Sequence, residues 1–61
     1  MTYLVSHKDN KGSILEGYFE VEAASAIEAV QHHTTWNAEM KGTDAVAANP
    51  EGSDFWEAFK K

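Results

Sequence analysis

The most constraining feature of this 61-residue chain is a change of hydrophobic period within residues 15–37. Up to residue 23 the apolar side chains recur at every second position, with Phe19 and Val21 on one side of the chain and glutamates on the other. This alternation is typical of a strand with one dry face and one wet face. From Ser25 onward the apolar residues follow the spacing of a helix.

A capping box marks the start of that helix. Ser25 is followed three residues later by Glu28, so each side chain can bond to the backbone N–H of the other residue. We expect the helix to end near Asn37, or to continue to Met40 and stop at Gly42. A strand that leads directly into a capped helix predicts that the helix folds back over the dry face of the strand.

The N-terminal residues predict a hairpin with this strand. Residues 2–7 (TYLVSH) are β-branched and aromatic, and residues 8–13 form a polar loop that contains Gly12. The two strands are therefore expected to pair in antiparallel fashion. We place Tyr3 and Val5 on one face of the first strand and Leu4 on the other.

The last third of the chain is less clear. Residues 43–48 predict either a third strand or a loose extended segment, because Val46 favours a strand while alanines pack poorly on a pleated surface. Residues 49–52 (NPEG) predict a turn. Ser53 or Asp54 is then expected to cap a short closing helix of about seven residues, with Asp54 and Glu57 as a box-like start. Whether its aromatic side chains pack on their own domain or on a neighbouring molecule stays open; they are Phe55, Trp56 and Phe59.

Together these elements predict a single small α+β domain over residues 1–61. It consists of an antiparallel two- or three-stranded sheet, one main helix packed on one face and a short C-terminal helix, in the order β-β-α-(β)-α. A domain of this size buries little surface, and the chain has no cysteine to form a disulfide. A homodimer is one further means of stabilising so small a core.

The charge of the chain excludes several classes of partner. Ten acidic residues stand against five lysines and no arginine, which gives a net charge of −5. Such a chain is a poor ligand for nucleic acid or for an anionic membrane surface. It has neither the roughly 20 apolar residues of a membrane span nor a secretory signal, so a cytoplasmic location is expected.

The three histidines are the first candidate site. His32 and His33 are neighbours, and neighbouring side chains on a helix point about 100° apart, so they cannot both bind one metal ion. We therefore expect His32 to be solvated and His33 to lie at the edge of the core, with no metal and no cofactor bound. The alternative is a small-ligand or metal site built from His33, Trp36 and the C-terminal aromatic helix.

Catalytic residues are not expected. The chain has no cysteine, no Gly-x-Ser-x-Gly sequence and no glycine-rich phosphate loop. A chain of 61 residues also has little room to enclose a pocket of roughly 300–1,000 Å³. These absences predict a protein that is not an enzyme.

The wet face of the second strand is the preferred candidate site. Glu16, Tyr18, Glu20 and Glu22 are expected to line it, where they would meet a basic protein surface, imitate a row of phosphates or keep a thin sheet soluble. Trp56 is expected at the rim of the core, where tryptophan often anchors an interface. The leading hypothesis is a non-catalytic acidic interaction protein that binds another, unidentified protein through this sheet face or through a strand edge.

Overall fold

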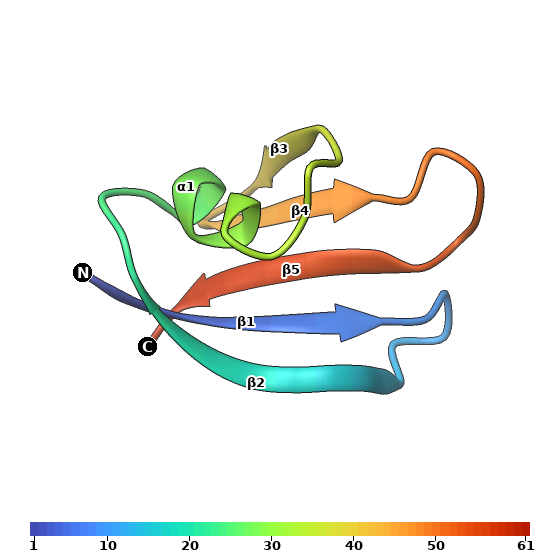
Figure 1. The fold of residues 1–61 in the computed structure, drawn as a ribbon, viewed down its shortest axis with the longest axis horizontal. Helices are drawn as coiled ribbons and strands as arrows, with labels where there is room; N and C mark the ends of the chain where they lie inside the picture. The colour runs from blue at the N-terminus through green and yellow to red at the C-terminus, as the bar shows by residue number, and fades with distance from the viewer.

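The computed structural model describes residues 1–61 as a five-stranded antiparallel sheet with one short helix across one face (Figure 1). The elements in chain order are β1 (Thr2–Lys8), β2 (Ile14–Glu22), α1 (Ala26–Gln31), β3 (Ala38–Lys41), β4 (Asp44–Ala48) and β5 (Phe55–Lys60). The strand order across the sheet is β2-β1-β5-β4-β3. β5 therefore lies at the centre, while β2 and β3 form the two edges.

The structure confirms the predicted hairpin and adds a bulge to it. Val5 lies opposite Phe19, but His7 lies opposite Glu16, so β2 holds one more residue than β1 over this stretch. Gly17 lies in this bulge and has a φ of +137°. A Cβ at this position would come within 2.8 Å of the Cβ of Ser6. Both its φ and the close approach of Ser6 therefore require glycine at this position.

The predicted helix begins where expected but is much shorter, and it packs over β5, β4, β3 and β1 rather than over β2, the strand that leads into it. The Ser25 hydroxyl accepts the Glu28 backbone N–H at 3.1 Å, while the Glu28 carboxylate accepts from the N–H of Ala24 rather than from that of Ser25. The helix ends at Gln31 after six residues. The next four residues, 32–35, are weak helix formers and include two threonines. No helix of the structure is long and apolar enough to cross a membrane.

The predicted C-terminal helix is wrong, and with it the predicted fold class. Residues 55–60 form the central strand β5, which pairs with β1 on one side and β4 on the other. Six residues cannot sustain a helix alone, whereas two neighbouring strands can satisfy the backbone groups of a strand on both sides. The carboxylate of Asp54, which was expected to cap a helix, instead bonds to His7 and Asn49.

The strand alternative for residues 43–48 is confirmed by β4, and β3 adds a strand that the sequence did not predict. β3 begins at Ala38, where a continuing helix was considered. The element order is consequently β-β-α-β-β-β rather than β-β-α-(β)-α, and the sheet has five strands instead of two or three.

A thin core lies between the helix and the sheet. Tyr3 and Val5 belong to it and Leu4 does not, as predicted. The eleven buried apolar side chains are Tyr3, Val5, Val21, Ala23, Ala26, Ala29, Val30, Ala45, Ala47, Trp56 and Ala58. Most of them are alanines contributed by both layers, which lets the helix lie close against the strands.

Candidate functional site

Helix α1 packs on one face of the sheet, and the opposite side, which we call the open face, has no element over it (Figure 1). Leu4 pairs with Phe59, and Val46 pairs with Glu57, so these side chains project on the side away from the buried core residues. The Tyr18 ring meets the Phe59 ring edge-on, with 5.8 Å between ring centroids. The apolar patch of the open face therefore comprises Leu4, Tyr18, Val46, Phe55 and Phe59.

An ion pair occupies the middle of this patch. The Lys8 Nζ lies 2.7 Å from the Glu57 Oε1, and the two side chains are only 19% and 20% exposed. The hydrogen bond to Glu57 raises the pKa of Lys8 above its usual 10.5. Because each charge already has its partner, covering the open face would leave neither of them unpaired.

Two of the predicted glutamates lie at the rim of the open face. Glu20 lies opposite Leu4 and accepts a hydrogen bond from the Lys61 ammonium at 3.0 Å. Glu22 accepts from the Thr2 hydroxyl at 2.8 Å. Hydrogen bonds from the Met1 amino group and from Thr2 lower the pKa of Glu22. Both carboxylates remain largely exposed, so these pairs are weak and can exchange for other cations.

The bulge separates Glu16 from the other predicted residues. Glu16 faces the helix side of the sheet, where its Oε2 lies 3.4 Å from the Nδ1 of His7. Tyr18, Glu20 and Glu22 stay on the open face, so the four residues of β2 do not form one row. Trp56 also projects to the helix side and is only 8% exposed, rather than standing at the rim.

Aromatic rings gather around Trp56 on the helix side. The His7 ring stacks on the Trp56 ring with 4.8 Å between centroids, and the His33 ring does so at 5.2 Å. Phe19 stacks against His33, and Trp36 meets His7 edge-on. The structure thus brings together His33, Trp36 and the C-terminal segment, although that segment is a strand and not a helix.

His7 is held between two carboxylates. Its Nε2 lies 2.7 Å from the Asp54 Oδ2, and its Nδ1 faces Glu16. The His7 hydrogen bond, followed by one from the Asn49 amide, lowers the pKa of Asp54 below its usual 3.8. An aspartate that orients a histidine is also found in nucleophilic triads. Here, however, the second ring nitrogen faces a carboxylate where a triad requires a hydroxyl or a thiol.

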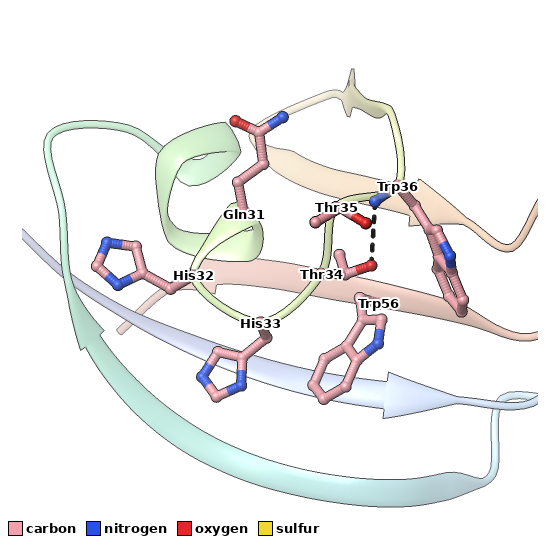
Figure 2. A pocket seen from close by; sticks show the side chains of 7 residues that line it. All are labelled: Gln31, His32, His33, Thr34, Thr35, Trp36 and Trp56. Atoms are coloured by element: carbon pink, nitrogen blue, oxygen red, sulfur yellow. Dashed lines mark hydrogen bonds between the residues drawn. The ribbon is translucent and has the colours of Figure 1, made fainter.

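A shallow pocket of about 500 Å³ opens beside this cluster. Residues 31–36 and Trp56 line it, and Figure 2 shows the His33 and Trp56 side chains below the loop that carries Thr34 and Thr35, with Trp36 beside that loop. His32 is exposed and His33 is half-buried, as predicted. The structure contains no group of three or more His, Asp or Glu side chains arranged to hold a metal ion.

Sequence reasoning missed the contact between His7 and Asp54. The two residues lie 47 positions apart, and only the pairing of β1 with β5 brings them together. The sequence signal for this strand is weak, because residues 55, 56, 58 and 59 are all apolar and so show no two-residue alternation.

Searches of family models, curated proteins and solved structures find no match to this chain.

Proposed function

We propose that this protein is a non-catalytic binding protein that holds a basic protein partner on the open face of its sheet. The observation that carries the proposal is the apolar patch of the open face, which lies opposite the only helix. Four of its five side chains are half-buried among their neighbours, and Tyr18 is 51% exposed. Clustered apolar side chains with a charged rim are characteristic of protein interaction sites.

The charge of the rim supports a basic partner. Glu20 and Glu22 lie along β2, and Glu39 and Asp44 lie on the same face at the opposite edge, where Lys41 stands opposite Asp44. Together with a net charge of −5, they would attract a lysine- or arginine-rich surface. A second copy of the chain would bring the same acidic rim and the same net charge, so a homodimer is the less favoured occupant.

The geometry favours the open face over a strand edge. β2 is nine residues long but carries the bulge at Gly17 and several charged side chains, and β3 is only four residues long. Bulges, charges and short length are the devices by which edge strands avoid pairing with another chain. The two edges are therefore poor places for strand addition.

The arrangement of His7 supports the non-catalytic part of the proposal. Both of its ring nitrogens lie beside carboxylates, so neither is directed at a hydroxyl or thiol that it could activate. The chain has no cysteine to act as a nucleophile.

Site-specific cross-linking tests this proposal. A photoreactive amino acid replaces Tyr18 on the open face and, in a matched variant, Ala24, which is exposed just before the helix. We expect a basic protein to cross-link from position 18 and not from position 24. The purified complex should weaken with added salt and with Phe59→Ser, whose fold is checked by circular dichroism.

The contrary outcomes are equally specific. Equal cross-linking from both positions, or a complex that is insensitive to salt, would contradict the proposal. Cross-linking of the chain to itself from position 18, with a mass that doubles in light scattering, would show that a second copy occupies the face.

A further inference from the structure

The pocket on the helix side of the sheet has a wall that suits a ligand unlike the basic protein proposed for the open face. None of the seven residues that line its 500 Å³ is a lysine, an arginine, an aspartate or a glutamate. A charged ligand would find no lysine, arginine or carboxylate in this wall to pair with. The wall therefore favours a neutral ligand.

Most of the polar groups in this wall have no partner within the chain. The Thr35 hydroxyl, the Gln31 amide and the Trp56 indole N–H line the pocket and take part in none of the hydrogen bonds of the structure. They comprise donors and acceptors. In Figure 2 the Thr35 hydroxyl and the Trp56 indole lie on the side of Trp36, whereas the Gln31 amide points away from both. A ligand hydroxyl can both donate and accept, so a ligand with several hydroxyls would satisfy this mixture.

One aromatic surface is available beside these groups. Trp56 is 8% exposed, because His7 and His33 stack against it, whereas Trp36 is only half-buried. Figure 2 shows the Trp36 side chain at one side of the pocket, next to the Thr34 and Thr35 hydroxyls. A cage for an organic cation needs several open aromatic faces, and this pocket offers a single one.

The loop that forms the wall is held in place before any ligand arrives. The Thr34 hydroxyl accepts the backbone N–H of Trp36 at 3.1 Å, and the His33 backbone N–H donates to the Val30 carbonyl at 3.0 Å. The His33 ring is fixed by stacking against Phe19 and Trp56. Binding would consequently cost little ordering of the loop.

We propose that this pocket binds a neutral saccharide, with one sugar ring against the Trp36 indole and its hydroxyls bonded to Thr35 and the Trp56 N–H. Phosphorylated sugars and nucleotides are disfavoured, since the wall has no lysine or arginine and the whole chain is acidic. The site lies on the face opposite the proposed protein-binding patch, so the two activities are independent.

The two tryptophans make the test direct, because each gives one indole N–H signal in a nitrogen–proton correlation spectrum. An array of neutral hexose, pentose and N-acetylhexosamine oligosaccharides is screened first, and the best ligand is titrated into labelled protein. We expect saturable shifts of both indole signals. Trp36→Ala and the near-isosteric Thr35→Val should each weaken binding by about tenfold, while Tyr18→Ala on the open face should leave it unchanged.

Tetramethylammonium and adenosine monophosphate serve as cationic and anionic comparison ligands at matched ionic strength. The proposal is overturned if no neutral saccharide on the array gives saturable shifts, or if either charged compound gives equal or larger ones. Unchanged affinity in folded Thr35→Val and Trp36→Ala would also overturn it, since binding would then lie elsewhere.

Discussion

His7 joins three parts of the chain through one side chain. Its ring nitrogens face Glu16 on β2 and Asp54 in the turn before β5, while the residue itself belongs to β1. This small network, rather than a larger core, ties the turn over residues 49–54 to the adjacent ends of β1 and β2, at the same end of the sheet (Figure 1).

The lowered pKa of Asp54 predicts a specific response to acid. A carboxyl whose pKa falls on folding stabilises the protein above its ordinary value of 3.8, and this contribution is lost as the pH falls through the lower pKa of the folded state. Wild-type protein should therefore lose more unfolding free energy on acidification than Asp54→Asn does. Urea unfolding from about pH 6 to about pH 2 measures the difference.

Glu51→Gln provides the control for this experiment, because Glu51 is exposed in the same turn and its side chain makes no ion pair. The unfolding free energy of Glu51→Gln should fall with pH in the same way as that of the wild type. Parallel curves for the wild type and Asp54→Asn would contradict the role given to the His7–Asp54 contact.

Gly17 is the second residue on which the sheet depends. Replacing it by alanine would place a Cβ within 2.8 Å of the Ser6 Cβ and 3.2 Å of the Val5 carbonyl oxygen, at a φ of +137°. We expect Gly17→Ala to lower the unfolding free energy by about 1–3 kcal/mol in urea titrations. Gly12→Ala, also at positive φ but with open space around it, is the matched control, and an equal loss in both variants would show that the contact with Ser6 does not matter.

Helix α1 is too short to persist without its cap and its packing. It has six residues, and isolated helices of fewer than about 12 residues are marginal in water. Ser25→Ala removes the hydroxyl that accepts the Glu28 N–H and should cost about 1 kcal/mol of unfolding free energy. Ser53→Ala, at an exposed serine whose side chain makes no hydrogen bond, should change little. Similar losses from both substitutions would argue against the cap.

The central position of β5 predicts slow hydrogen exchange. β5 pairs with β1 and β4, so amides of residues 56–60 should be among the best protected in the chain. Those of the edge strand β3, which pairs only with β4, should exchange faster. Nuclear magnetic resonance after transfer to heavy water measures both, and rapid exchange throughout residues 56–60 would instead fit a frayed terminal helix.

The molecule as a whole shows which parts of a fold are encoded locally. The hairpin, the Ser25 cap and the turn at 49–52 follow from neighbouring residues, and the sequence predicts each of them. The secondary structure of residues 55–60 does not follow from neighbouring residues. Asp54 and Glu57 imitate a helix start, and the segment becomes a strand only because β1 and β4 flank it. The positions of the predicted site residues were likewise predicted only in part. Glu20 and Glu22 lie on the open face, as the two-residue alternation of β2 indicates, but the bulge at Gly17 moves Glu16 to the other side.

The alanine-rich core predicts intolerance of added volume. Ala58 is fully buried and lies opposite Val5 on one side and Ala45 on the other. Ala58→Leu should lower the unfolding free energy by about 1–3 kcal/mol, measured by urea titration, because the helix cannot approach so closely. Ala48→Leu, at an exposed alanine of β4, should have little effect. A core that accepted leucine at position 58 without loss would indicate unfilled space beneath the helix.

The same layer of alanines limits how such a chain can diversify. A bulkier residue on the helix could be accommodated only by a smaller one on the strands, and glycine is the sole residue smaller than Ala45, Ala47 or Ala58. Glycine would weaken the strand that carried it. Amino-acid substitutions are therefore tolerated mainly on the two outward surfaces. Related chains could exchange one ligand for another while keeping the same interior.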